Sequence, residues 1–202
     1  MLQPSFESTQ SKEKIVWKVR EAIKTDAKVI LEISEKTWLA TYAGIRDTNG
    51  YIMDEAFFKS KFAKYSNEFK ITRIENTIQD PTKKVLVNTI GNGQIVGFAF
   101  LKLLENNIWA WYIDPEFQGK GAGMALWNQI QIILNANTQK ITLEIAAENY
   151  KAQAFYTKIG FVKDPNNLIP DFYMGKNSKS DQVWAPQFRM FRPPENQNDQ
   201  IA

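Results

Sequence analysis

The sequence predicts a mixed α/β fold in a single domain. The chain has 202 residues, which suits one domain with a full hydrophobic core. Extended apolar runs alternate with stretches whose apolar residues recur every three to four positions. Three neighbouring strands are followed by alternating helices and strands, an order that is typical of a mixed central sheet flanked by helices.

The first half of the chain is predicted to hold a strand, two helical regions and a hairpin. Asp26 suits the positively polarised end of a helix, and Pro81 ends the second helical region. Gly91-Asn92-Gly93 is a hairpin signal between two apolar runs. The predicted elements, in order, are a strand at 15–19, a helix at 26–42, helical structure over 54–79, and strands at 84–87 and 95–101.

The second half is predicted to alternate between strands and helices. Apolar residues recur at helical spacing from residue 123 to residue 134, which predicts a helix with one face packed inward. Flexible tails are predicted at 1–12 and 193–202, around a domain at 13–192. The predicted elements are a strand at 108–113, a helix at 123–134, a strand at 141–146, a helix at 152–159, extended structure at 160–162 and a last strand near 182–190.

The composition excludes several kinds of chemistry. The chain contains no cysteine and no histidine, which excludes disulfides, thiolate metal sites, cysteine nucleophiles and the usual histidine base. The formal charge is +3 without any basic run, so we expect no nucleic-acid partner. Because no stretch of ~18 apolar residues and no apolar signal core is found, we expect no membrane partner and a cytoplasmic location. We also expect no metal.

The segment from Ile113 to Met124 carries the strongest chemical signal. It joins a predicted strand to a predicted helix and contains glycines at 119, 121 and 123. These glycines allow the backbone to approach a ligand, and the N–H groups at the start of the helix favour an anion. A Rossmann fingerprint would need glycine at Met124, and a P-loop would need Ser or Thr at Gly121. A tight turn without a ligand remains the alternative.

Two motifs in the correct order resemble the GNAT superfamily of acetyltransferases. Gln118-x-x-Gly121-x-Gly123 matches the signature that binds the coenzyme A pyrophosphate in that family. A second signature follows at Asn149-x-x-Ala152-x-x-Phe155-Tyr156-x-x-x-Gly160-Phe161. The resemblance is sharp over 108–162. Further along, Asp171-Phe172-Tyr173-Met174-Gly175 with Asp181 is similar to PaiA-type polyamine acetyltransferases.

The resemblance implies a single GNAT domain that uses acetyl-CoA as its co-substrate. Backbone groups of the strand that ends at Ile113 would hold the pantetheine arm, and Asn149 would bind the arm or cap the next helix. The implied coenzyme-binding residues are Trp111, Tyr112, Ile113, Gln118, Gly119, Lys120, Gly121, Ala122, Gly123, Met124 and Asn149.

Tyr156 and Glu144 are the candidate catalytic residues. Tyr156 lies seven residues after Asn149, as the family's general acid does, and its hydroxyl could protonate the departing thiolate. Glu144 matches the spacing of the proton acceptor in ribosomal-protein-alanine acetyltransferases, and Glu148 is a weaker competitor. Core packing of Tyr156 and a solvated Glu144 are the alternatives. Direct transfer in a ternary complex is expected, because no acyl-enzyme nucleophile is evident.

The expected acceptor is a primary amine, either of a small molecule or polyamine or of a peptide. A polyamine pocket should combine carboxylates with an aromatic wall. A non-catalytic module that binds acyl-CoA is a third interpretation, and a homodimer formed through the aromatic-rich C-terminal segment stays open. The candidate acceptor residues are Trp38, Tyr42, Asp47, Asp171 and Tyr173, with Glu35 and Asp181 as further carboxylates.

Overall fold

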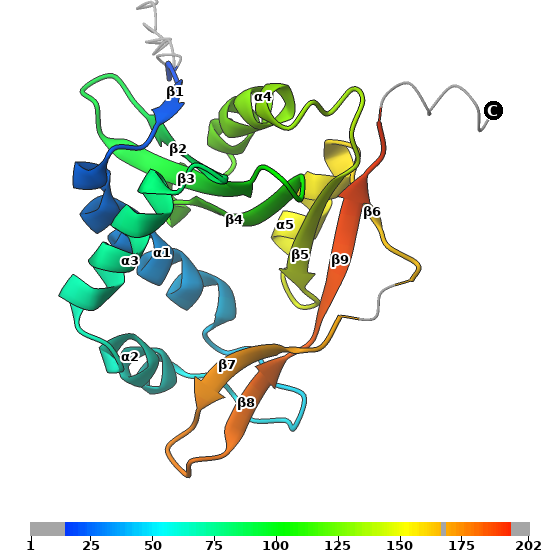
Figure 1. Ribbon diagram of the computed structural model, residues 1–202. Coiled ribbons are helices and arrows are strands. Elements are labelled where there is room, and N and C mark those ends of the chain that lie inside the picture. The colour runs from blue at the N-terminus through cyan, green and yellow to red at the C-terminus, as the bar shows by residue number, and fades with distance from the viewer. Residues whose placement is uncertain (1–14, 167–168, 195–202) are drawn as a thin grey trace, which may run out of the picture.

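A mixed seven-stranded sheet forms the centre of the protein. The computed structural model describes residues 15–166 and 169–194 (Figure 1). The sheet order is β1-β2-β3-β4-β5-β9-β6, and β4–β5 is the parallel pair among otherwise antiparallel neighbours in the described residues. The predicted mixed α/β fold is confirmed. The strands are β1 (Lys18–Glu21), β2 (Lys83–Thr89), β3 (Ile95–Lys102), β4 (Asn107–Ile113), β5 (Ile141–Ala146), β6 (Val162–Lys163) and β9 (Gln187–Arg192).

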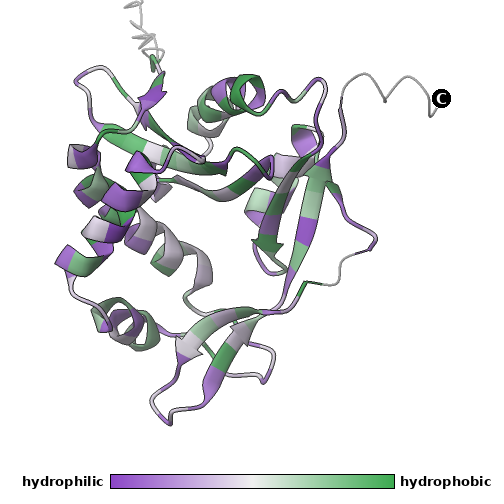
Figure 2. Ribbon diagram, in the orientation of Figure 1, coloured by the Kyte–Doolittle hydropathy of each residue, from purple (hydrophilic) through white to green (hydrophobic). Residues whose placement is uncertain are grey.

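Helices cover both faces of the sheet. On one face, Ile30 and Ile33 of α1 pack against β2 and β3, and α3 completes this layer. On the other face, α4 packs against β2 and β3, and α4, α5 and β5 share one core that contains Leu126, Trp127 and Phe161. In Figure 2, β3 is mostly hydrophobic and α3 carries many hydrophilic residues. The helices are α1 (Ala27–Tyr42), α2 (Glu55–Ala63), α3 (Asn67–Gln79), α4 (Ala122–Ile133) and α5 (Tyr150–Lys158), with short 3-10 turns η1 (Lys24–Asp26) and η2 (Pro115–Phe117).

The region predicted to be helical with breaks over 54–79 consists of two helices, α2 and α3. Asp54 caps α2 by accepting a hydrogen bond from the Phe57 N–H at 2.8 Å. Ser66 caps α3 in the same way, accepting from the Phe69 N–H at 3.2 Å. A second N-cap in mid-segment starts a new helix direction, which explains the break at residues 64–66.

A separate hairpin of β7 (Phe172–Lys176) and β8 (Gln182–Ala185) packs against α2 rather than joining the main sheet (Figure 1). The sequence predicted one strand near 182–190, and this prediction is wrong at Pro186, where β8 ends and β9 begins in a different sheet. Proline has no N–H for a strand ladder. Its carbonyl accepts from the Ala147 N–H at 2.8 Å instead. Strand β7 was not predicted.

The first strand also differs from its prediction. It covers Lys18–Glu21 instead of 15–19, because β2 pairs with it only from Leu86 to Thr89. Ile15 and Val16, which the prediction included, are exposed, with Val16 at 75%. The predicted tail at 1–12 and residues 195–202 of the predicted tail at 193–202 lie outside the described residues.

Candidate active site

Strands β4 and β5 part after two paired residues, and the candidate site lies at this division. The parallel register covers only Asn107 with Thr142 and Ile108 with Leu143. A bulge in β4 at Trp109 breaks its register with β3 at the same level. A bulge bends a strand and redirects its side chains. The remainder of β4 therefore continues with β3, while β5 continues with β9.

The segment after β4 forms a loop with an exposed backbone. The Gln118 side chain donates to the Ile113 carbonyl at 3.0 Å, which ties the loop to the end of β4. Gly119 and Gly121 have φ values of +72° and +98°, a conformation that favours glycine. A side chain built at Gly119 would meet no atom within 4 Å. Gly121 is the N-cap of α4, so free N–H groups and the positive end of the helix dipole face this loop.

The other residues of the glycine segment have different surroundings. A Cβ at Gly121 would lie 3.2 Å from the Trp17 indole nitrogen, and one at Gly123 would lie 3.1 Å from the Phe155 ring. The absence of a side chain at Gly123 therefore allows α4 and α5 to pack closely. Ala122 is buried, and its carbonyl accepts from the Asn88 amide at 3.0 Å. Lys120 is exposed above the Phe117 ring, and Met124 is 39% exposed.

Three tyrosines from three elements influence one another beside the divided strands. They are Tyr42 at the end of α1, Tyr112 on β4 and Tyr156 on α5. Burial is the main cause that raises the pKa of Tyr156, and the neighbouring Tyr112 and Tyr42 raise it further. Burial likewise raises the pKa values of Tyr42 and Tyr112. All three phenols are therefore protonated hydrogen-bond donors near neutral pH.

Trp111 and Asn149 fix the surroundings of Tyr156. The Trp111 ring lies 5.5 Å from the Tyr156 ring and 6.2 Å from the Trp127 ring, so this side chain packs in the core. Asn149 caps α5 by accepting from the Ala152 N–H at 3.3 Å. Its side chain also interacts with Tyr42, whose pKa it lowers against the larger effect of burial.

Neither candidate base belongs to the tyrosine cluster. Ile141, Leu143 and Ile145 face α4 and α5, so the alternation of β5 puts Glu144 on the opposite face. There Glu144 pairs with Arg189 at 3.1 Å. Glu148 accepts from the Tyr150 hydroxyl at 2.7 Å. Glu144 is exposed to solvent, on the face of the sheet that Tyr112 shares.

An aromatic wall continues from the tyrosine cluster toward α2 and the β7–β8 hairpin. The Trp38 indole N–H donates to the Tyr112 hydroxyl at 3.0 Å. The Trp38 ring also lies 5.3 Å from the Tyr42 ring and 5.7 Å from the Phe172 ring. Tyr173, on the alternate face of β7, packs against Trp184 at 5.0 Å instead.

The carboxylates expected in the acceptor pocket do not assemble into one cluster. Asp47 is buried and accepts from the N–H groups of Asn49 and Tyr51, so it shapes its own loop. Glu35 pairs with Lys70 at 2.6 Å. Asp181 accepts from the Asn177 amide in the turn between β7 and β8. Asp171 is exposed beside Phe172.

A comparison with family models decides which family this arrangement represents. Residues 51–171, more than half of the chain, match the model described as the acetyltransferase (GNAT) domain. The chain belongs to the GNAT acetyltransferase family. The match includes the divided strands, the glycine loop and α5, whereas α1 and the whole β7–β8 hairpin lie outside it.

One relative and two solved structures named as N-acetyltransferases are similar to this chain. A spermidine N(1)-acetyltransferase of Thermoplasma acidophilum is 25% identical over 166 residues, which cover 80% of this chain and 98% of the relative. The crystal structure of the PaiA N-acetyltransferase of T. acidophilum with coenzyme A has a TM-score of 0.64 at 20% identity, covering 88% of this chain and 99% of that one. A spermidine N-acetyltransferase of Vibrio cholerae with CoA and spermine has a TM-score of 0.58 at 20% identity, with 88% and 95% covered.

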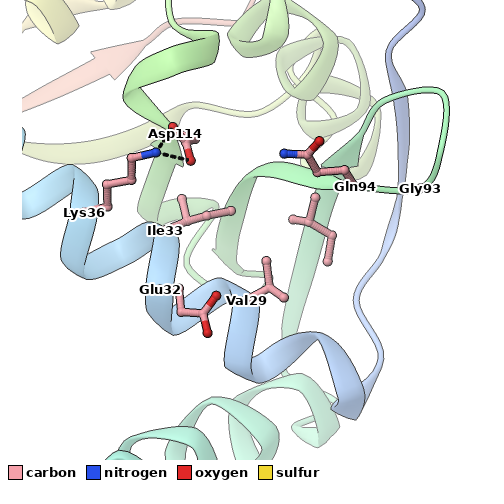
Figure 3. A pocket seen from close by; sticks show the side chains of 8 residues that line it. Val29, Glu32, Ile33, Lys36, Gly93, Gln94 and Asp114 are labelled. Atoms are coloured by element: carbon pink, nitrogen blue, oxygen red, sulfur yellow. Dashed lines mark hydrogen bonds and ion pairs between the residues drawn. The ribbon is translucent and has the colours of Figure 1, made fainter.

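A cavity of this GNAT domain lies outside the candidate site. This cavity of about 440 Å³ lies between α1, the turn of the β2–β3 hairpin and Asp114 (Figure 3). Lys36 of α1 pairs there with Asp114 at 2.9 Å and with Glu116 at 2.8 Å (Figure 3 draws the Asp114 contact). The pair attaches the start of the glycine loop to α1.

No helix in the described residues is long and apolar enough to cross a membrane.

Lys61 is the residue of the aromatic wall that sequence reasoning missed. Its ammonium lies 5.0 Å above the Trp38 ring and donates to the Met174 carbonyl. Burial, and to a lesser extent the charge of Lys64, lowers the pKa of Lys61 to about 8. A signal was present, because Lys61 shares an apolar helical stripe with Phe57, Phe58 and Phe62.

The pKa of Lys61 predicts how stability changes with pH. Its folded value of about 8 is below the ordinary 10.5, so between these pH values the unfolded chain binds more protons. The unfolding free energy therefore gains a contribution that increases from pH 8 to 10.5, by about 3 kcal/mol in all. Urea denaturation should find this contribution in the parent and in Lys59→Met, an exposed control on the same helix, and not in Lys61→Met. Identical pH profiles for Lys61→Met and the parent would contradict the burial of this charge.

Proposed function

We propose that this GNAT protein transfers the acetyl group of acetyl-CoA to a primary amine by direct reaction in a ternary complex. The observation that carries the proposal is the convergence of three features. These are the division between β4 and β5, the exposed Gly119 backbone at the start of α4, and Tyr156 beside the divided strand. The coenzyme A bound to the T. acidophilum PaiA structure supports the same choice of co-substrate.

The proposed coenzyme site uses mainly backbone groups. The backbone of β4 from Trp111 to Ile113 would bind the pantetheine arm along the edge that β5 no longer occupies, with the Ile113 carbonyl already accepting from Gln118. The N–H groups of the loop from Gln118 to Met124 would bind the pyrophosphate at the positive end of α4. Asn149, beside Tyr42, would bind the arm while it caps α5.

The proposed reaction moves protons at three points. The amine nitrogen attacks the acetyl carbonyl carbon, a C–N bond forms, and the C–S bond breaks. The departing thiolate takes its proton from the Tyr156 hydroxyl, which burial keeps protonated until then, and the second proton that the nitrogen loses as the amide forms restores that hydroxyl. The acceptor must first lose a proton, and Glu144 would accept it through water from the solvent side of β5.

The proposed acceptor is a small amine, with spermidine as the first compound to test. The named spermidine acetyltransferases among the relatives and the aromatic wall at Trp38, Phe172 and Tyr42 support this choice. A peptide N-terminus or lysine is the rival acceptor. A screen of amines and peptides with acetyl-CoA, read as thiol release, separates them. If acetyl-CoA binds but no acceptor leads to thiol release, a non-catalytic module is favoured.

Gly119→Asn tests the pyrophosphate assignment without the strain that a larger change would cause. Asparagine tolerates the left-handed backbone, and nothing within 4 Å obstructs its side chain. The side chain should nevertheless obstruct the anion, so acetyl-CoA should bind about tenfold more weakly in calorimetry. Gly93→Asn is the matched control, because Gly93 has φ +85° and equal space in another turn. Equal affinities of both variants would refute the assignment.

Tyr156→Phe tests the general acid. It removes one hydroxyl and keeps the ring packed against Trp111 and Phe161. We expect kcat to fall on the order of 10²-fold with little change in acetyl-CoA affinity. Tyr150→Phe, which removes an exposed hydroxyl bonded to Glu148, should retain full turnover. If the Tyr156 variant also keeps full turnover, Tyr156 has only a packing role.

A further inference from the structure

The acceptor side of the site already contains a primary amine of the protein itself. The Lys61 ammonium lies over the Trp38 ring at 5.0 Å and donates to the Met174 carbonyl of β7. Trp38 connects directly to the reaction centre, since its indole N–H donates to the Tyr112 hydroxyl and Tyr112 influences Tyr156. The Lys61 ammonium already makes the cation–π contact with the Trp38 ring, so an incoming ammonium cannot make the same contact.

The charge of Lys61 is not balanced by an ion pair in the described part of the chain. The neighbouring charge that affects it is another cation, Lys64. Glu35, on the helix that carries Trp38, is already paired with Lys70 at 2.6 Å. The aromatic wall therefore carries a net positive charge where a long acceptor would extend away from Tyr156.

A fixed charge of this kind discriminates between acceptors by their far ends. Like charges repel strongly where water is scarce, and partners are often rejected through such unfavourable contacts. A carboxylate or carbonyl oxygen in the same place would be attracted to the ammonium. Every acceptor presents the same amine to the acetyl group. The contact of Lys61 with the far end of the acceptor therefore leaves the transfer step unchanged.

We propose that Lys61 determines acceptor selectivity, disfavouring amines that carry a second ammonium toward Trp38 and favouring amines whose far end is neutral or a carboxylate. This inference rests on the proposed function and narrows its substrate class. It places the second charge of a diamine or polyamine in competition with Lys61. Spermidine would then be a poorer substrate than an amine of the same length and hydrophobic stem that carries no second charge.

Three acceptors with one four-carbon stem test the proposal. They are 4-aminobutanoate, butylamine and 1,4-diaminobutane, which end in a carboxylate, a methyl group and an ammonium. The parent protein should rank them by kcat/KM in that order. In Lys61→Met the ratio of diamine to carboxylate should rise roughly tenfold, because one charge contact is removed for each compound. A ratio from one preparation does not depend on how much of the variant is active.

Further variants separate charge from structure. Lys61→Gln removes the charge and keeps an N–H for the Met174 carbonyl, so it should behave as Lys61→Met does. Lys61→Arg keeps the charge and should retain the parent ratio. Lys59→Met removes an exposed charge on the same helix and should also retain it.

The outcomes distinguish this inference from the proposed function. Turnover of these amines with an unchanged ratio in both neutral variants overturns the role of Lys61 and leaves the acetyltransferase proposal intact. A ratio in Lys61→Arg that shifts as it does in Lys61→Met also overturns it, because packing and not charge would be the cause. No turnover of any amine defeats the proposed function, and this inference with it.

Discussion

The division between β4 and β5 is the constraint on which the site depends. Parallel strands normally satisfy each other's backbone groups along their whole length. Here the bulge at Trp109 redirects β4 immediately after Ile108 pairs with Leu143. Trp111 then packs against Trp127, Phe155 and Tyr156, which stabilises the redirected strand from below. Unpaired backbone groups are costly unless another partner satisfies them. The core thus maintains a strand edge that is suited to an extended ligand.

A second group of elements completes the acceptor side. Met53, Phe57, Phe58 and Met174 form a small core between α2, the loop after α1 and the β7–β8 hairpin. It is distinct from the core under α4 and α5. The two groups meet at Trp38, Tyr42 and Tyr112, whose contacts link α1 to β4. The coenzyme side rests on motifs shared across the family, whereas the acceptor side is built from segments that lie largely outside the family match.

Sequence reasoning succeeded where periodicity and glycine chemistry are local. Helix α4 and strands β2 to β5 follow from apolar spacing, and the left-handed Gly119 and Gly121 lie in the segment with the strongest motif. It failed where a distant partner decides the outcome. Pro186 splits one apolar run between two sheets. Asp47 is a local error instead, because an aspartate shortly before Asn49-Gly50 is typical of a turn, and its carboxylate accepts from the N–H groups of Asn49 and Tyr51. The pairing of Glu144 with Arg189 depends on the register of β5 against β9, which no local pattern contains.

Amide hydrogen exchange on β4 and β5, measured with and without acetyl-CoA, tests whether acetyl-CoA binds along the divided strands. We expect acetyl-CoA to slow exchange at residues 109–113 and 144–146, where the two strands no longer pair, and at the Gly119 loop. Residues of β2, which pairs with strands on both sides, should change little by comparison. Protection confined to the loop, with β4 and β5 unchanged, would contradict a ligand bound along the divided strands.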